Sequence, residues 1–217
     1  MSELISLDAE GYALAHTSAL TGPLAGAADW TLSNTPWPGM MSGLAELRLL
    51  QALIVAGGAR RVLEIGTFTG VGTVGMAAAL PEGGRVITLE FDEAHAEIAH
   101  RHIDASGLGD RIEVIVGDAL QTLARLEGPF DLVYVDAAKE DYPGYYEAVV
   151  PKLAPRGVIV ADNLFRAGAV LDDTARDLGT RRMREFTDLV QADDRTDNVL
   201  LTVGDGLMLA WRKPAAG

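Results

Sequence analysis

The sequence predicts an α/β fold, a doubly wound and mostly parallel sheet with helices on both faces and a reversed edge. Three observations support this prediction. From residue 44 onward, short apolar runs alternate five times with longer stretches of helical character. These runs are continuous in Val, Ile and Leu, which is typical of strands buried on both faces. The last two runs are separated only by residues 204–206 (GDG), so they form a hairpin in which one strand is antiparallel to its neighbour.

The elements are expected in chain order as follows. Residues 21–43 hold Pro23, Pro36 and Pro38 among several glycines, which predicts a loop with room for one helical turn. A helix is expected at 44–56 from its Leu and Ala content, and glycines stop it at 57 and 58. Strands are then expected at 61–66, 85–90, 111–118, 130–138 and 157–163. Helices are expected at 71–80, 92–107, near 119–126, 142–153 and near 171–192, before hairpin strands at 197–203 and 207–212.

Composition restricts the class of protein. The chain has 217 residues, 48% of them hydrophobic, which predicts a single globular domain over 1–217 whose first 43 residues form a helix-and-loop arm and a candidate lid. Its 18 basic and 31 acidic residues give a net charge of −13, which argues against a nucleic-acid or anionic-membrane partner. No cysteine is present, so disulfides, thiolate nucleophiles and cysteine-bound metals are excluded.

Two further features predict a soluble, cytoplasmic protein. No Lys or Arg precedes Arg48, whereas a signal peptide begins with a basic segment. No apolar run approaches the roughly 18 residues that span a bilayer.

Carboxylates mark the ends of all five predicted strands. They are Glu64, Glu90, Asp118, Asp136 and Asp162. Ligands of open α/β sheets bind outside the carboxyl ends of the strands, so these side chains are expected to form a site. Acids at these places also cap helices, but a full set of five is more than capping requires.

The turn after the first strand, Glu64 to Gly70, restricts the class of ligand that the site can bind. A dinucleotide fingerprint G-x-G-x-x-G has a glycine where this chain has Glu64, so a pyrophosphate is disfavoured. Glu90 ends the second strand, where a carboxylate can accept both ribose hydroxyls. Asp118 and the Ala119 N–H are placed to read an adenine edge. An adenosine without phosphate but with a positive centre fits these places, and S-adenosylmethionine is such a ligand.

The ordered segments VLEIGTFTG, RVITLE, GDAL, VYVDAAKEDY, GVIVADN and VGDGLMLAWR resemble the class I methyltransferases of the catechol and caffeoyl-coenzyme A O-methyltransferase family. The resemblance runs from about Met40 to Arg212. It implies a Rossmann-like sheet of seven strands, S-adenosylmethionine as cofactor, a divalent metal, and methyl transfer to one hydroxyl of a vicinal pair on an aromatic ring. It also implies a homodimer.

The resemblance assigns roles residue by residue. It makes Asp136, Asp162 and Asn163 the metal ligands and Lys139 the catalytic base, with Asp136 at both the acceptor and the cofactor. Two carboxylates and an amide oxygen suit Mg²⁺, Mn²⁺ or Ca²⁺ and not zinc. The alternatives are that the Asp-Asn pair caps a helix and that Lys139 is a surface lysine. The cofactor is expected to contact Met40, Ser42, Glu64, Gly66, Thr67, Gly70, Gly72, Glu90, Asp118, Ala119 and Asp136.

The sequence departs from the family pattern at several positions. Ala138 replaces an acid, and Gly72 stands where a serine often contributes a hydroxyl to the methionine end of the cofactor. The helix that usually carries Gly-Gln has Leu47 and Arg48. The arm lacks a basic residue for coenzyme A, which favours a free small phenol as acceptor. Trp37 and Met41 extend the segment that lines the cofactor pocket, and three histidines on one predicted helix are expected to be solvated: His95, His100 and His102.

The predicted mechanism is a chelation-assisted displacement. The metal binds both oxygens of a catechol-like acceptor, Lys139 takes a proton, and the phenolate attacks the sulfonium methyl in line. Three alternatives stay open: a metal-independent small-molecule methyltransferase, an NAD(P)-dependent oxidoreductase on a similar sheet, and a relative that binds the cofactor without catalysis.

Overall fold

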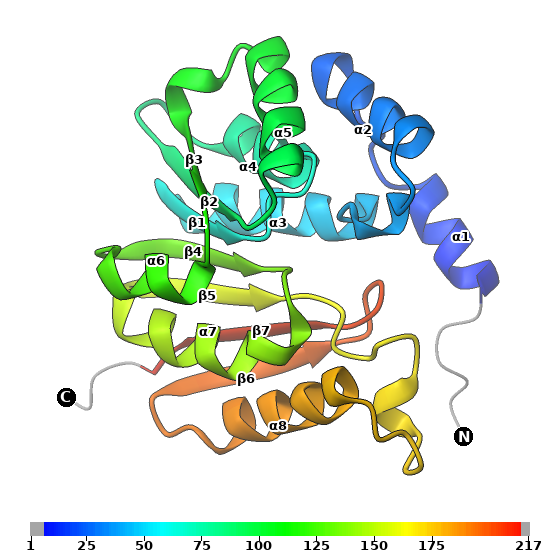
Figure 1. The fold of residues 1–217 in the computed structure, drawn as a ribbon, viewed down its shortest axis with the longest axis vertical. Helices are drawn as coiled ribbons and strands as arrows, with labels where there is room; N and C mark the ends of the chain where they lie inside the picture. Colours follow the sequence, from blue (N-terminus) through cyan, green and yellow to red (C-terminus); the bar gives the residue numbers. More distant parts are fainter. Residues whose placement is uncertain (1–6, 214–217) are drawn as a thin grey trace.

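The computed structural model describes residues 7–213, so the outermost residues of the predicted arm (1–6) and of the predicted domain (214–217) lie outside it. Seven strands form one sheet in the order β3-β2-β1-β4-β5-β7-β6 (Figure 1). Their bounds are β1 Arg61–Ile65, β2 Arg85–Glu90, β3 Ile112–Val116, β4 Phe130–Val135, β5 Leu153–Ala161, β6 Thr196–Leu201 and β7 Leu207–Arg212.

The first five strands are parallel, and β7 is antiparallel to both β5 and β6. The predicted doubly wound sheet with an antiparallel carboxy-terminal hairpin is therefore confirmed. The strand order reverses between β1 and β4, and this switch point is where ligands bind in such sheets.

Helices cover both faces of the sheet because apolar side chains project from both. On one face Leu123, Tyr146 and Phe186 pack on the sheet from α6 (Ala119–Arg125), α7 (Tyr142–Val149) and α8 (Leu178–Ala192), which lie in front in Figure 1. On the other face Leu50 and Met76 pack from α3 (Leu44–Gly57) and α4 (Val71–Ala79), and α5 (Glu93–Ser106) lies beside α4.

The amino-terminal arm contains more helix than the sequence predicts. The loop expected at 21–43 is wrong for its first half, because Gly22–Asn34 forms the 13-residue helix α2. Pro23 lies in the first turn, where a missing N–H breaks no helical hydrogen bond. Ala27 and Ala28 then pack against Leu47 and Val71. A shorter helix, α1 (Leu7–Ala15), precedes α2.

Other boundaries also differ: the helix expected at 142–153 ends at Val149, and the strand expected at 130–138 ends at Val135. The helix expected near 171–192 begins only at Leu178, where the Asp177 side chain accepts a hydrogen bond from Thr180 N (2.9 Å) as a cap, while 169–171 is a short 3₁₀ turn. Strand β5 begins at Leu153 rather than at 157.

Arg48 holds the arm against the domain. Its guanidinium donates to Ser18 O (2.9 Å) and Ala19 O (2.6 Å), and also to Gln51 Oε1. By length and composition, Pro38–Gly57 is apolar enough to cross a membrane, with a mean hydropathy of 1.3. In the fold this stretch is interrupted at 41–43, and the part that forms α3 buries Leu47, Leu50 and Ile54 in the domain.

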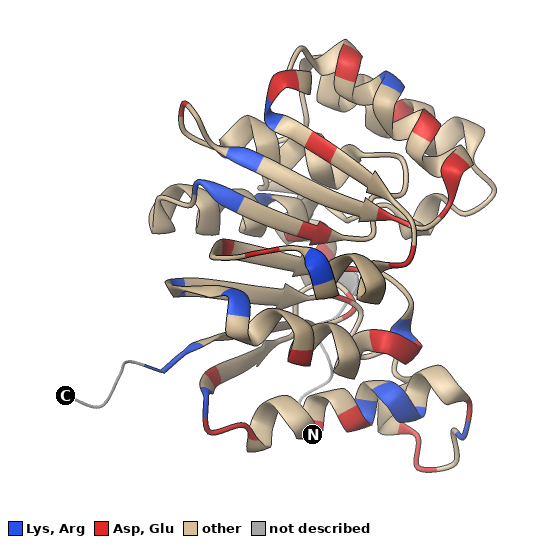
Figure 2. Cartoon of the chain, turned by 60° about the vertical axis from the view of Figure 1, so that its left-hand side comes forward, with Lys and Arg blue, Asp and Glu red and all other residues tan. Residues whose placement is uncertain are grey.

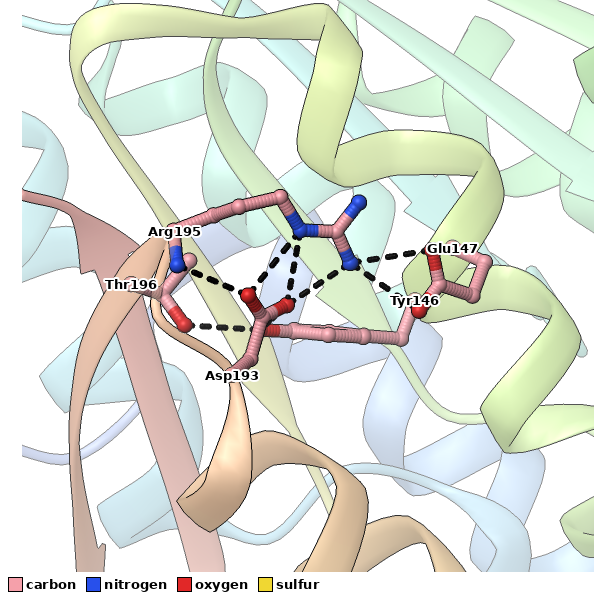
Figure 3. Close-up of polar contacts among 5 residues, drawn as sticks. All are labelled: Tyr146, Glu147, Asp193, Arg195 and Thr196. Carbon is pink, nitrogen blue, oxygen red and sulfur yellow. Dashed lines mark hydrogen bonds and ion pairs between the residues drawn. The ribbon is translucent and has the colours of Figure 1, made fainter.

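At the other end of the molecule a polar cluster joins α7 to the turn between α8 and β6. Figure 3 shows the Arg195 guanidinium between the carboxylates of Asp193 and Glu147, with shortest distances of 2.7 and 2.9 Å. Tyr146 donates from its hydroxyl to Asp193 Oδ2 (3.0 Å). This cluster fixes the start of the edge strand β6.

Candidate active site

A cleft of about 590 Å³ opens at the carboxyl ends of the parallel strands. It lies where the five strand-end acids were expected to meet. Among the predicted site residues, twelve line it: Met40, Ser42, Glu64, Gly66, Thr67, Gly72, Glu90, Asp118, Ala119, Asp136, Lys139 and Asn163. Gly70 and Asp162 lie behind this lining. Met41 also borders the cleft, whereas Trp37 does not and is 65% exposed.

The turn between β1 and α4 passes close to the end of β4. Gly66 has φ +102°, and a Cβ built there would lie 2.0 Å from the carbonyl oxygen of Asp136. Only glycine allows this approach, because any side chain would push the ends of β1 and β4 apart. Gly70, also at positive φ, starts α4. The turn thus presents backbone to the cleft.

Glu64 is buried under this turn, with 1% of its surface exposed. Its Oε2 accepts hydrogen bonds from the hydroxyls of Thr73 and Thr88, while Oε1 lies 2.8 Å from where a Cβ on Gly72 would stand. Ser42 Oγ lies 3.2 Å from the same point. Burial, assisted by the charge of Asp136, raises the pKa of Glu64 to about 8. A cation bound beside this carboxyl would favour its charged form.

Glu90 ties the end of β2 to the β1–α4 turn. Its Oε2 accepts from the backbone N–H groups of Thr67 (3.1 Å) and Phe68 (2.7 Å), and its Oε1 accepts from Asp92 N (2.9 Å). Each carboxylate oxygen has a second acceptor site, so these bonds leave capacity for ligand hydroxyls. Contact of Glu90 with a ribose stays a prediction.

Asp118 caps a helix, which was the alternative reading of the strand-end acids. Its Oδ1 accepts from Gln121 N (2.8 Å) at the start of α6. The capping interaction positions the residue beside the cleft together with Ala119, so the two roles do not exclude each other. The adenine contact predicted for this pair stays a prediction.

The predicted metal ligands and the predicted base meet at the ends of β4 and β5. The Lys139 ammonium donates to Asp136 Oδ1 (2.8 Å), Asn163 Oδ1 (2.6 Å) and the Tyr142 hydroxyl oxygen (2.9 Å). Lys139 is only 19% exposed, so it is not the surface lysine of the alternative reading. Two of the three predicted ligand oxygens therefore already converge on one cation.

Asp162 lies deeper than its two companions. Its Oδ2 accepts from the Tyr134 hydroxyl (2.8 Å) and its Oδ1 from Asn163 N (2.6 Å). Burial and then the charge of Asp136 raise the pKa of Asp162 to about 7. Because Asp162 bonds Asn163 N, it also shapes the turn that aims the Asn163 amide. Within residues 7–213, no three His, Asp or Glu side chains gather into a metal site. The predicted metal ligands include only two carboxylates, and the third ligand is the Asn163 amide.

The sequence prediction for the histidines is wrong for two of them. His95 lines the cleft, 3.8 Å from Glu90 Oε1 and edge-on to Phe68. His102 is half-buried and its Nδ1 is hydrogen-bonded to Thr69 O (2.8 Å). Both lie on the side of α5 that faces the β1–α4 turn. This orientation depends on packing between segments that are distant in the sequence. His100 is exposed, as expected.

Three aromatic lining residues escaped the sequence prediction: Phe68, Phe91 and Tyr145. Phe91 follows Glu90 directly and is 80% exposed, so it offers a free ring beside the cleft. Its position directly after a strand-end acid is the sequence feature from which Phe91 could have been predicted to border the cleft.

A family model described as O-methyltransferase matches residues 16–213. The chain belongs to the O-methyltransferase family. It is 35% identical to a catechol O-methyltransferase of Niastella koreensis over 85% of this chain and 87% of that one, and 44% identical to a catechol O-methyltransferase of Mycobacterium tuberculosis over 70% and 71%. The structure resembles that of the O-methyltransferase TomG from Streptomyces achromogenes in complex with SAM, with a TM-score of 0.86 and 31% identity over 94% and 96% of the two chains.

These similarities make this member of the O-methyltransferase family a transferase that takes its methyl group from S-adenosylmethionine. The finding agrees with the resemblance inferred from the sequence motifs and decides against the oxidoreductase alternative. The cleft at the β1–β4 switch point is where the fold offers room for this cofactor.

Proposed function

We propose that the protein transfers the methyl group of S-adenosylmethionine to one hydroxyl of a catechol-like small molecule, with the help of a divalent metal ion. The observation that carries the proposal is the convergence of Asp136, Asn163 and Lys139 on one point at the cleft. The relatives named catechol O-methyltransferase support the acceptor class.

The residues at this point fit a divalent cation. Asp136 Oδ1 and Asn163 Oδ1 already hold an ammonium between them, which marks a place where positive charge is stabilised. Asp162, whose pKa is raised by burial and by Asp136, is the neighbouring carboxyl that a cation would favour in its charged form. The donors are all oxygen, which suits Mg²⁺, Mn²⁺ or Ca²⁺. When bound, such an ion would polarise the acceptor oxygens and lower the pKa of the hydroxyl.

Lys139 is the group that moves the proton. Its Nζ lies within reach of the oxygens that would border an acceptor, and Tyr142 holds it there from below through its buried hydroxyl. Tyr142 in turn donates to the backbone oxygens of Val135 (3.1 Å) and Asp162 (3.0 Å). The buried Tyr142 hydroxyl thus fixes the position of the Lys139 amine relative to the strand ends. Positioning of this kind accounts for much of the rate enhancement in a displacement reaction.

The remaining lining residues are proposed to hold the methyl donor. Glu64 and Ser42 would meet its ammonium near Gly72, Glu90 its ribose, and Asp118 with Ala119 its adenine. Phe91 and His95 would border the adenosine. In this arrangement the sulfonium faces Asp136, between the cofactor and acceptor halves of the cleft.

A free phenol is proposed rather than a coenzyme A ester. The acids lining the cleft outnumber its one lysine, and no basic residue precedes Arg48, so nothing in the arm neutralises a chain of phosphates. A homodimeric assembly and a cytoplasmic location stay predictions.

The test is methyl transfer to a simple catechol by the purified protein, measured in EDTA and after addition of Mg²⁺. We expect turnover to be abolished by EDTA and restored by Mg²⁺, while S-adenosylhomocysteine binds in both. Lys139→Met should bind S-adenosylhomocysteine normally but lose turnover. Equal turnover in EDTA and Mg²⁺ would remove the metal from the proposal.

One observation favours the metal-independent alternative. The Lys139 ammonium itself lies between Asp136 and Asn163, where it provides a positive charge without a metal. In that case EDTA would leave turnover unchanged, and Lys139→Met would still abolish it.

A further inference from the structure

The edge of the sheet opposite the cleft carries a pocket of about 370 Å³ lined by four arginines. Arg60 and Arg61 stand at the start of β1, Arg85 begins β2, and Arg111 immediately precedes β3. The other lining residues are Gly83, Val86, Ile87 and Glu113. In Figure 2 the blue segments at the starts of these strands mark this edge, while acidic residues lie at the ends of the arrows.

None of the four arginines forms an ion pair with any residue in the part of the chain that the structure describes. Backbone oxygens take only part of their hydrogen-bonding capacity. Arg60 donates to Glu82 O (2.9 Å), Arg61 to Glu127 O (2.6 Å) and Pro129 O (3.5 Å), and Arg111 to Leu80 O (3.4 Å). A guanidinium has five N–H donors, so most of them remain available.

Four guanidinium groups without an ion-pair partner among residues 7–213 line this pocket, in a chain with a net charge of −13. The Arg61 guanidinium also stacks on the Phe130 ring, 4.6 Å from its centroid. The lining has four positive charges against the one negative charge of Glu113. Asp131 is not part of the lining, and its Oδ2 accepts from the backbone N–H groups of Arg60 (2.8 Å) and Arg61 (2.9 Å) rather than from a guanidinium. Like charges brought together raise the free energy of the fold unless an anion lies between them.

We propose that this pocket binds a small multivalent oxyanion, a metabolite carrying phosphate or several carboxylate groups, with Arg85 and Arg111 as its main ligands. The planar guanidinium fork matches both phosphate and carboxylate oxygens. The pocket has the volume of a small-molecule site. Arg85 and Glu90 are the two ends of β2, so the pocket lies roughly 17 Å from the cofactor cleft and is a separate site.

The experiment is calorimetric titration of the full chain with inorganic pyrophosphate and, separately, with citrate, at constant ionic strength. Arg85→Gln is the informative variant, because the Arg85 side chain is exposed and forms no ion pair with residues 7–213. Arg156→Gln is the matched control, an exposed arginine on β5 at the same edge but outside the pocket.

We expect one saturable site for at least one probe, weakened about tenfold by Arg85→Gln and unchanged by Arg156→Gln. Binding of pyrophosphate alone would identify a phosphate ligand, and binding of citrate alone a polycarboxylate. Affinity for S-adenosylhomocysteine should be the same in both variants as in the unaltered chain. Absence of saturable binding by both probes, or equal binding by the Arg85→Gln variant, would overturn the proposal.

Discussion

Glu64 should carry a proton in the free protein and lose it when the methyl donor binds. The carboxyl is buried and its pKa is raised to about 8, first by burial and further by the charges of Asp136 and Glu90. S-adenosylmethionine and S-adenosylhomocysteine both carry an ammonium group. An ammonium beside a buried carboxylate stabilises its charged form, so binding should lower the pKa of Glu64.

The size of this effect follows from the pKa. With a value near 8, roughly nine in ten molecules hold the proton at pH 7. If the ligand lowers the pKa to about 6, roughly 0.8 protons leave on binding at pH 7. Because release favours binding at higher pH, affinity should rise about fivefold per pH unit between about pH 6 and 8, and level off above it.

Isothermal titration of S-adenosylhomocysteine in buffers with different ionisation enthalpies measures the released protons directly. Glu64→Gln keeps the acceptors for Thr73 and Thr88 but cannot ionise, so it should bind more weakly and release none. Glu127→Gln, at an exposed carboxylate outside the cleft, is the control and should behave as the unaltered chain. Equal proton release by Glu64→Gln and the unaltered chain would refute the reasoning.

Three other predictions concern stability and binding. The folded chain keeps Glu64 neutral up to about pH 8, whereas the unfolded chain ionises it above about pH 4.5. As the pH rises from 5 to 8, the unfolding free energy of the unaltered chain should therefore fall by on the order of 3 kcal/mol relative to that of Glu64→Gln in urea titrations, and a constant difference would contradict this. Hydrogen bonds from Arg195 lower the pKa of Asp193 to about 2. Asp193→Asn should therefore lower the unfolding free energy by about 1 kcal/mol in urea melts at pH 7, a value reduced because the Arg195 guanidinium is half-exposed, and this loss should disappear as the pH falls from about 4 to 2. An unchanged loss at low pH would contradict this prediction. Gly66→Ala should abolish S-adenosylhomocysteine binding and lower stability by more than about 2 kcal/mol, because its Cβ meets the Asp136 carbonyl; normal binding would rule out that close approach.

The sheet was predictable from sequence because its signal is local. Continuous Val, Ile and Leu runs mark strands buried on both faces, and GDG marks the hairpin. Helix α2 was missed because the prolines and glycines of 21–43 also occur in loops. Its helical state depends on Ala27 and Ala28 packing on Leu47 and Val71, which lie far along the chain. Local propensity cannot report such contacts.

The candidate site, like the fold, could be predicted only in part. Acids at strand ends could be found because parallel strands bring their carboxyl ends to one edge. The roles of individual side chains could not, since they depend on distant partners: Lys139 is held by Asn163, and His95 faces the cleft only because α5 packs beside the β1–α4 turn. Asp118 shows that capping and cleft lining can coincide at one residue.

The distribution of charge over the sheet has two physical origins. In this topology the helices begin at the carboxyl edge of the strands, and Asp92, Asp118 and Asp177 cap α5, α6 and α8 there, where the helix dipole favours negative charge. The same dipole would favour bases in the last turns of helices at the opposite edge, but among the described α-helices only α6 has one, Arg125. The arginines of that edge instead stand at strand starts, including Arg61 and Arg85. Helix dipoles therefore explain acids around the cleft but not the arginine pocket, whose charge calls for a ligand of its own.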